Sequence, residues 1–349
     1  MKRYSKPIGK LLNFKQEFFK SNDAKLEEFR AIASLYGSQP RRMACKNCGH
    51  HLDAPPSECF RKLGVDYCLC QRCGHCNGLH EDTEAFCRSL YTADQGESYA
   101  KNYSVSDVRQ YEERVREVYF PKAQFLVDAL AELGQPPSRL VDFGAGAGYF
   151  VSAAIKSGFN DVSGYEPSET LVSFGNAMIG SKKLVWHDLS EMVALIEKSD
   201  ATVASFIGVI EHVQAPREVL KALSQSDNIK YVFFSVPLFS PTVVLESVFE
   251  QIMPRHLAAA HTHLYTENSI QYFCDEFGFK RQSEWWFGLD VCDLFRSVLV
   301  SLEKSGASTA SLQDYWRDRF MPLIDDLQGI LDKAHACSEV HMLLTKNGC

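Results

Sequence analysis

Apolar residues follow two alternating patterns over most of the chain after residue 107. Short runs of Val, Ile, Leu and Phe are typical of buried strands, and the stretches between them repeat apolar positions every three or four residues, as amphipathic helices do. This alternation predicts an α/β fold: a doubly wound, seven-stranded, Rossmann-like sheet with helices on both faces. The predicted strands cover residues 139–144, 161–167, 183–188, 201–210, 229–237, 279–288 and 338–347. The predicted helices between them cover residues 147–158, 168–180, 216–225, 267–278, 289–304 and 311–335.

The residues before this sheet differ from it in pattern and composition. A helical stretch runs from an N-cap at Ser106 or Asp107 to Gly134, and Pro121 is expected to break it in two. Ahead of it lies a Cys/His-rich stretch with little helical periodicity, and ahead of that a basic, helical one. We therefore divide the chain into a basic helical arm (1–44), a zinc-ribbon module (45–90), a Tyr-rich lid and helical linker (91–134) and a core (135–349).

Charge is unevenly distributed along the chain. The net charge is −7, yet residues 1–44 hold ten Lys/Arg and four Asp/Glu. Such an arm can meet phosphate groups, or it can be an ordinary solvated helix docked on the body. No apolar run approaches the roughly 18 residues that span a bilayer, and the first residues lack a signal-peptide pattern. We expect a cytoplasmic protein without a membrane span, and the sequence leaves the oligomeric state open.

A glycine-rich turn follows the first predicted strand of the core. In "LVDFGAGAGYF", an apolar strand ends in Asp142, and Gly144, Gly146 and Gly148 precede a helix. Glycines at such a turn let the backbone approach a ligand closely. A dinucleotide site would instead show G-x-G-x-x-G and an acid about 20 residues later. Here the third glycine comes one residue early and an acid precedes the loop.

This stretch resembles motif I of the class I S-adenosylmethionine (SAM)-dependent methyltransferases, D-x-G-x-G-x-G. The resemblance covers about residues 107–347. It implies a methyltransferase in which Glu166 binds the ribose hydroxyls, Asp188 and Leu189 meet the adenine, and "IGVIEHVQAP" flanks the methyl-transfer centre. It also implies that the last two strands are antiparallel. The resemblance assigns SAM binding to Asp142, Gly144, Ala145, Gly146, Gly148, Tyr149, Glu166, Pro167, Asp188, Leu189, Ile207 and Gly208.

The chemistry of SAM agrees with these residues. A carboxylate can accept hydrogen bonds from two ribose hydroxyls, and acids end three successive predicted strands, where ligands bind in open α/β sheets. A dinucleotide enzyme, an inactive Rossmann-like domain and a SAM-binding regulator without catalysis are the alternatives.

Histidines cluster where the acceptor is expected. His261 and His263 lie with Tyr265 in a loop after the fifth strand, and His212 follows the fourth strand. Imidazole can take a proton near neutral pH, so we predict these four residues to be catalytic. In an extended loop His261 and His263 share a side, one facing the acceptor and the other supporting it. A packing role for His212 is an alternative. A second metal at the loop is another, although no acid is spaced to complete that site.

Eight of the twelve cysteines lie between Cys45 and Cys87. In a cytoplasmic chain this clustering favours metal over disulfides. "CKNCGH" and "CQRCGH" give C-x₂-C-x₂₁-C-x₂-C, which predicts a structural zinc bound by Cys45, Cys48, Cys70 and Cys73. A mixed site using His50, His51 or His75 is an alternative, and a redox C-x-x-C is another.

The methyl acceptor is inferred from the segments that accompany this core in the chain. The order of zinc ribbon, Tyr-rich segment, SAM core and His-bearing loop resembles bacterial sugar and surface-polysaccharide methyltransferases. We therefore expect a small polar acceptor, a sugar or sugar nucleotide, and a place in carbohydrate biosynthesis. The alternative is an RNA base methyltransferase that uses the ribbon and the basic arm to bind RNA. The acidic core argues against a nucleic acid.

Overall fold

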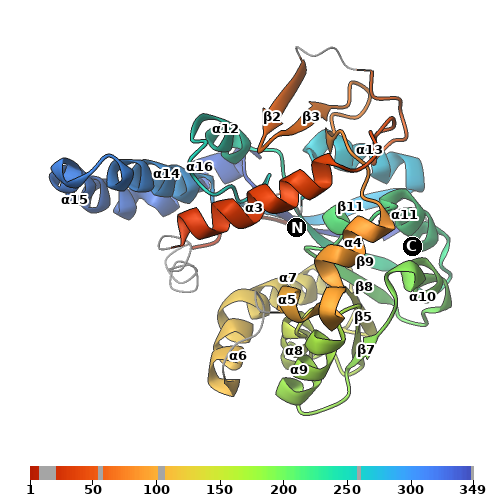
Figure 1. Cartoon of the computed structure of the whole chain (residues 1–349). Helices are drawn as coiled ribbons and strands as arrows, with labels where there is room; N and C mark the ends of the chain where they lie inside the picture. Colours follow the sequence, from red (N-terminus) through yellow and green to blue (C-terminus); the bar gives the residue numbers. More distant parts are fainter. Residues whose placement is uncertain (8–20, 54–57, 101–106, 258–260, 347–349) are drawn as a thin grey trace.

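An eight-stranded, mostly parallel sheet forms the centre of the computed structural model, which describes residues 1–7, 21–53, 58–100, 107–257 and 261–346 (Figure 1). The strand order is β1-β11-β12-β9-β8-β5-β6-β7. Strands β5 to β9 run parallel, and β12 is antiparallel to both β9 and β11. The strands are β1 (Lys2–Tyr4), β5 (Leu140–Phe143), β6 (Val162–Glu166), β7 (Leu184–Trp186), β8 (Val203–Ile207), β9 (Tyr231–Pro237), β11 (Phe279–Phe287) and β12 (Glu339–Lys346).

The prediction of seven strands is wrong by one, because β1 adds an edge strand. Lys2–Tyr4 pairs in parallel with β11, and the Arg3 guanidinium lies 4.1 Å from the centre of the Trp285 ring. Three residues are too few to show a periodic pattern, so the sequence did not reveal this strand. It lies in the stretch that was expected to be a helical arm. The same stretch also forms helix α3 (Asn22–Gly37).

Helices cover both faces of the sheet, because successive side chains of each strand point to opposite faces. On β9, Phe233 packs with α7 to α9, while Val232 and Phe234 pack with α10, α11 and α13. The helices on the first face are α7 (Phe120–Ala131), α8 (Tyr149–Lys156) and α9 (Glu169–Ile179). Those on the second are α10 (Met192–Lys198), α11 (Pro216–Gln225) and α13 (Glu267–Phe277).

The helical linker is interrupted near the predicted position. Helix α6 (Val108–Arg114), capped by the Asp107 side chain, passes through a π-helical turn (Val115–Tyr119) into α7. Pro121 lies in the first turn of α7, where its missing N–H costs no hydrogen bond. Two short helices precede this linker, α4 (Glu84–Tyr91) and α5 (Glu97–Ala100).

A second, four-stranded sheet contains the Cys-rich segment. Its strands are β2 (Cys59–Lys62), β3 (Val65–Leu69), β4 (Cys76–Gly78) and β10 (His263–Leu264), in the order β10-β4-β3-β2. Strand β10 belongs to the His-bearing loop of the core, so the two parts of the chain share one sheet.

A disulfide corrects the expectation of free thiols in this segment. Cys59 and Cys68 lie opposite each other on β2 and β3, with their Cα atoms 4.4 Å apart, and form a disulfide. Directly opposed positions of an antiparallel pair bring Cβ atoms into disulfide range. Sequence spacing alone gave no sign of this pairing.

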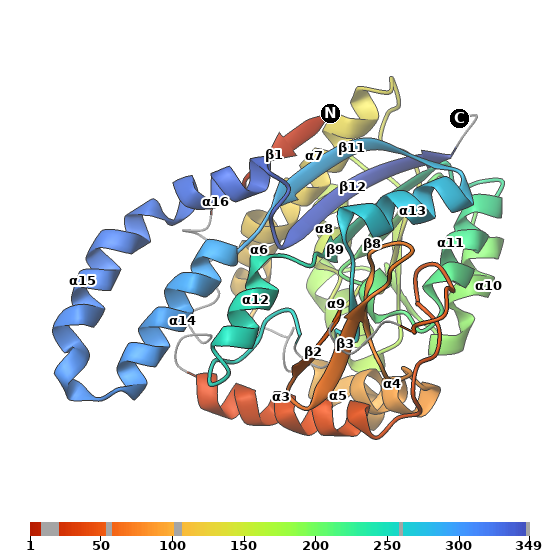
Figure 2. The ribbon, with the colours of Figure 1, turned by 90° about the horizontal axis from the view of Figure 1, so that it is seen from above.

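Three helices project from the end of the molecule (Figure 2). They are α14 (Asp290–Lys304), α15 (Ala310–Phe320) and α16 (Ile324–Lys333). The predicted helix over 311–335 is therefore two helices, because Pro322 lies in the 3₁₀ turn between them. Within the described residues, no helix combines the length and apolarity needed to cross a bilayer.

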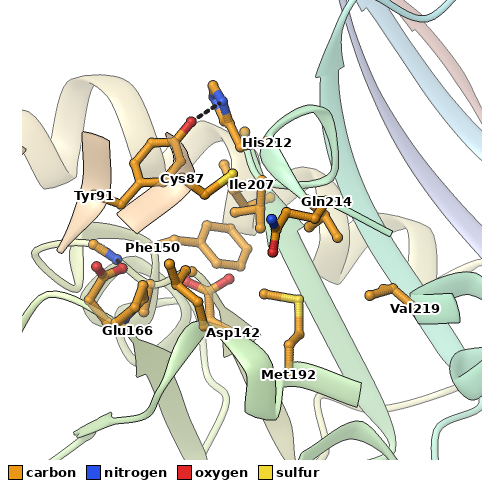
Figure 3. A pocket seen from close by; sticks show the side chains of 18 of the residues that line it. Cys87, Tyr91, Asp142, Phe150, Glu166, Met192, Ile207, His212, Gln214 and Val219 are labelled. Atoms are coloured by element: carbon orange, nitrogen blue, oxygen red, sulfur yellow. Dashed lines mark hydrogen bonds between the residues drawn. The ribbon is translucent and has the colours of Figure 1, made fainter. Parts of the chain in front are cut away.

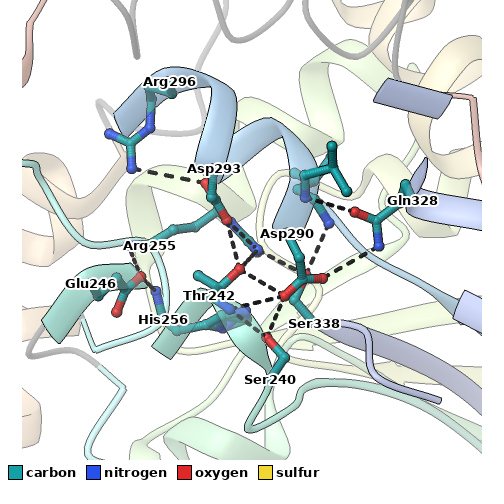
Figure 4. A network of polar contacts seen from close by, with 12 residues as sticks. Ser240, Thr242, Glu246, Arg255, His256, Asp290, Asp293, Arg296, Gln328 and Ser338 are labelled. Carbon is teal, nitrogen blue, oxygen red and sulfur yellow. Dashed lines mark hydrogen bonds and ion pairs between the residues drawn. The ribbon is translucent and has the colours of Figure 1, made fainter. Parts of the chain in front are cut away.

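A buried polar network ties these helices to the core (Figure 4). The Asp290 carboxylate accepts hydrogen bonds from the Ser240 hydroxyl and from the backbone N–H and hydroxyl of Thr242, at 2.5, 3.1 and 2.8 Å. Thr242 lies in α12 (Pro241–Val248). Arg255 bridges Asp293 and the Ser338 hydroxyl, both at 2.8 Å. Because every charge in the network has a partner, we assign it to structure rather than to chemistry.

Candidate functional site

A cavity of about 390 Å³ opens at the carboxyl ends of β5, β6 and β8. In open α/β sheets this edge is where ligands bind, because loops diverge there. The glycine-rich loop after β5 forms its floor, and α4 and the turn after β8 face that loop (Figure 3). The residues that line the cavity come from five segments: 87–91, 119, 142–167, 189–193 and 207–219.

The glycines of the loop have backbone conformations that other residues rarely adopt. Gly144 and Gly146 have φ of 68° and 54°. A Cβ on Gly144 would lie 2.6 Å from Cγ2 of Val209, whereas one on Gly146 would meet no atom within 4 Å. Gly144 therefore permits close packing, and Gly146 leaves open space beside the backbone for a ligand.

Two buried carboxylates stand at the ends of neighbouring strands. Glu166, on β6, accepts hydrogen bonds from the backbone N–H groups of Gly146 and Ser168 at 2.8 and 2.9 Å. Asp142, on β5, accepts one from the Ser205 hydroxyl at 2.6 Å. Burial raises the pKa of both carboxyls to about 7. Each carboxylate keeps lone pairs for a ligand that donates hydroxyl or amino groups.

The opposite side of the cavity carries a tyrosine and a histidine. The hydroxyl of Tyr91, on α4, lies 3.0 Å from Nδ1 of His212 (Figure 3). His212 ends a 3₁₀ turn (Ile210–His212) that begins three residues after the end of β8. Tyr91 and the neighbouring Cys87 were missed by sequence reasoning, because α4 lies far from motif I in the chain and folds back over the cavity.

Glu211, His212 and His261 form a cluster beside this wall. Their ligand atoms all lie within 4.8 Å of one another, and the rings of His212 and His261 are 4.9 Å apart. Burial raises the pKa of Glu211 to about 8 and lowers that of His261 to about 4. The expectation that no acid accompanies the loop histidines is wrong, because Glu211 comes from a different turn of the chain.

Comparison with known proteins bears directly on this cavity. Residues 111–284 match the family described as "Methyltransferase domain". The chain carries a SAM-dependent methyltransferase domain. The match spans β5 to β9 and includes the glycine loop, both buried carboxylates and the Glu211–His261 cluster. The predicted methyltransferase activity is confirmed.

Several solved methyltransferase structures resemble the chain, and no curated protein matches it. Magnesium protoporphyrin IX methyltransferase from Synechocystis PCC 6803 covers 76% of this chain and 100% of its own at 11% identity, with a TM-score of 0.47. The plantazolicin methyltransferase BpumL covers 75% and 94% at 14% identity, with a TM-score of 0.46. The methyltransferase domain of bacterial CtHen1 covers 65% and 98% at 14% identity, with a TM-score of 0.41. Sequence identities and TM-scores this low give no information about the methyl acceptor.

The methyltransferase cavity contains most of the residues assigned to SAM from sequence. Asp142, Gly144, Ala145, Gly146, Tyr149, Glu166, Pro167, Leu189, Ile207 and Gly208 line it. Gly148 and Asp188 do not. Gly148 packs against Ile179 and Leu184, and Asp188 caps the following 3₁₀ turn and pairs with Arg88 at 2.8 Å outside the cavity. The cavity is also lined by residues that were not assigned to SAM: Ala147, Phe150, Ser190, Met192, Val193, Val209 and Gln214. The last two lie in the segment 207–216, which was expected to flank the methyl-transfer centre.

The other three predicted catalytic residues lie at different depths. His261 contacts His212, but His263 and Tyr265 are fully buried behind it. His263 Nδ1 lies 2.8 Å from Nε2 of His75 in the Cys-rich module. We therefore place His212 at the cavity, His261 directly behind it, and His263 and Tyr265 in the supporting layer between the core and the Cys-rich module.

The Tyr-rich lid predicted within residues 91–134 is placed only in part. Tyr111 and Tyr119 stack on Tyr149, with ring centres 4.6 and 5.3 Å away, and Arg114 lies over the same ring at 4.7 Å. Tyr103 lies outside the described residues, as does the Tyr99 side chain. The placed residues hold Tyr149 at the edge of the cavity.

The four predicted zinc ligands converge in the structure. Sγ of Cys45 lies 3.7 Å from that of Cys73, and Sγ of Cys48 lies 3.6 Å from that of Cys70. Sulfurs about 2.3 Å from a tetrahedral zinc lie about 3.8 Å apart, so the cluster fits the metal. Both knuckles repeat one backbone pattern: Gly49 donates to the Cys45 carbonyl, and Gly74 to that of Cys70. His50, His51 and His75 are not part of this cluster.

Ligand affinity is expected to depend on pH in the physiological range. A ribose hydroxyl donates to Glu166 best when that carboxyl is ionised, and its pKa of about 7 keeps it largely protonated below neutrality. Binding must then release a proton, so affinity for S-adenosylhomocysteine should rise about tenfold per pH unit below pH 7 and level off above it. Calorimetric titration between pH 5.5 and 8.5 measures this. A slope that survives in Glu166→Gln would assign the effect to Asp142 instead.

Proposed function

We propose that the enzyme transfers a methyl group from SAM to a small polar acceptor, a sugar or a sugar nucleotide. The observation that carries this proposal is the polar wall of Tyr91 and His212 across the cavity from Glu166, with His261 against the far side of His212. This wall can bind an acceptor bearing hydroxyl groups. An acceptor bound to this wall would place its reactive atom opposite Glu166, on the side of the cavity where the methyl group of SAM would be delivered.

Binding and chemistry divide between the two sides of the cavity. Glu166 would accept the ribose hydroxyls, Asp142 would face the amino-acid end, and the space beside Gly146 would admit the ligand. SAM supplies a methyl group on a cationic sulfur. The acceptor forms its new bond to that carbon while the carbon–sulfur bond breaks and its electron pair stays on sulfur. We propose that His212 and His261 activate the acceptor, with His263 and Tyr265 supporting them.

We propose that the Cys-rich module is a structural zinc ribbon that holds this wall in place. Strand β10 of the His-bearing loop pairs with β4, and Asn47 donates to the backbone carbonyl of Ser269 at 2.9 Å. The Lys46 ammonium binds the Val213 carbonyl at 2.8 Å, next to His212. Through these contacts the ribbon positions both His212 and His261.

An RNA acceptor is the second candidate, because the stretch 1–44 is strongly basic. Its described cations are largely engaged within the protein. Arg42 is buried and pairs with Asp82 at 2.9 Å, while Lys25 and Arg30 pair with glutamates of their own helix. Paired cations offer little to phosphates. This arrangement favours a small acceptor over RNA.

Transfer of labelled methyl into separate acceptor pools tests the proposal. We expect label from SAM in nucleotide sugars or cell-envelope extract and none in total RNA. The Glu166→Gln variant, which should bind SAM much more weakly, controls for label that enters without the enzyme. Label in RNA alone would replace the sugar proposal with the RNA candidate. SAM binding without transfer to any pool would indicate a regulator.

A further inference from the structure

We propose that Glu211, His212 and His261 hold a divalent cation at the acceptor end of the cavity. This inference rests on the proposed function, since it specifies how that wall activates an acceptor hydroxyl. It concerns a site separate from the four-cysteine cluster, with nitrogen and oxygen ligands in place of sulfur.

Geometry brings the three side chains together from two segments. Glu211 and His212 are consecutive in the 3₁₀ turn after β8, and His261 lies in the loop before β10. Their ligand atoms lie within 4.8 Å of one another. Ligands bound to one metal at about 2.1 Å are about 3.0–3.4 Å apart, so small side-chain rotations would complete the site.

The hydrogen bonds of both imidazoles suit metal ligation. His261 Nδ1 lies 2.8 Å from the backbone carbonyl of His256, which can only accept, so Nδ1 carries the proton and Nε2 keeps its lone pair. His212 Nδ1 lies 3.0 Å from the Tyr91 hydroxyl. Metal-bound histidines almost always engage their second nitrogen with a carbonyl or another polar group in this way. His261 therefore presents Nε2 to a cation, beside the ring of His212.

The Glu211 carboxylate has an unmet need for a partner. The residue is 3% exposed, and its buried Oε2 has no hydrogen-bond partner among the described residues. Buried carboxylate oxygens without partners are costly, and in native proteins they commonly coordinate metals. A cation at this position would satisfy the oxygen.

The ligand set fixes the class of metal and the chemistry that it supports. Two imidazole nitrogens and one carboxylate oxygen favour zinc, iron(II), manganese(II) or cobalt(II), and leave coordination positions open. An acceptor hydroxyl in an open position would lose its proton to solvent at neutral pH. Its oxygen then forms the bond to the methyl carbon as the carbon–sulfur bond breaks. The acceptor class is accordingly one with a hydroxyl group.

Binding of Co²⁺ to the full-length protein tests the site without any acceptor. Protein that carries zinc at the four cysteines is titrated with Co²⁺ by calorimetry and visible absorption. We expect one Co²⁺ per chain, without the thiolate charge-transfer bands of a cysteine site. Glu211→Gln and His261→Ala should weaken this binding at least about 100-fold. Glu197→Gln makes the same chemical change at an exposed position of α10 and should bind like the wild type.

Binding of S-adenosylhomocysteine separates this inference from the proposed function. The Glu211→Gln and His261→Ala variants should keep their affinity for it, which also reports that they fold. If Glu211→Gln fails to fold, the His261→Ala variant, at a half-buried position, still tests the site. The proposal is overturned if the wild type binds no such Co²⁺ or if both variants bind it equally well. A failed acceptor assay beside positive Co²⁺ binding would count against the sugar assignment alone.

Discussion

Glu166→Ala is expected to weaken SAM binding at least about 100-fold and to remove methyl transfer with it. Two hydrogen bonds from ribose hydroxyls to one buried carboxylate contribute about 3 kcal/mol or more together, which corresponds to that factor. The substitution also removes the acceptor for the Gly146 N–H, which holds the glycine loop. Calorimetry with SAM measures the loss.

Two further variants separate these effects. Glu166→Gln keeps the side-chain volume but loses the charge. Compared with Glu166→Ala, it should therefore recover the conformation of the glycine loop more fully than the affinity for SAM. Glu169, three residues along and exposed on α9, provides a control, because Glu169→Gln should bind SAM normally. Unchanged SAM affinity in Glu166→Ala would mean that the ligand lies elsewhere in the cavity.

Cys70→Ser is expected to release the zinc from the ribbon and to destabilise the whole enzyme. A structural zinc contributes about 10 kcal/mol or more to the folding of small modules, so removing one thiolate should cost a large part of the ribbon's stability. Loss should spread to the His-bearing loop, because β10 pairs with β4 in the ribbon sheet. Elemental analysis and thermal unfolding measure both effects.

Cys76→Ser supplies the matched control for this experiment. Cys76 is fully buried six positions after Cys70, but its sulfur is not part of the four-cysteine cluster. The variant should keep one zinc per chain and lose only the stability that a buried serine costs. Equal zinc content in Cys70→Ser and Cys76→Ser would show that the cluster does not hold the metal.

The core was predictable because its signals are local. The positive φ of Gly144 and Gly146 requires glycine, and the acids at 142 and 166 lie within the last two residues of their strands, so both signals appear in the printed sequence. The C-x₂-C knuckles are equally local, since a two-residue spacer allows one metal to bind both thiolates.

The parts that escaped prediction depend on contacts between distant segments. Glu211 meets His261, and Tyr91 meets His212 across 121 positions, only after the sheet has formed. Strands β1 and β10 have three and two residues, too few to show a period. Asp188 appeared to belong to the cavity because it ends a strand, yet it caps the next turn and pairs with Arg88.

The pairing of β10 with β4 has a consequence for synthesis of the chain. His75 and His263 lie 188 positions apart, so the ribbon leaves the ribosome long before the strand that completes its sheet. Until then the edge of β4 offers unpaired backbone groups, which can pair with another chain. Zinc bound early would fix both knuckles and keep the edge of β4 folded until β10 has been synthesised. Cells short of zinc should therefore accumulate aggregated nascent enzyme rather than a folded, inactive form.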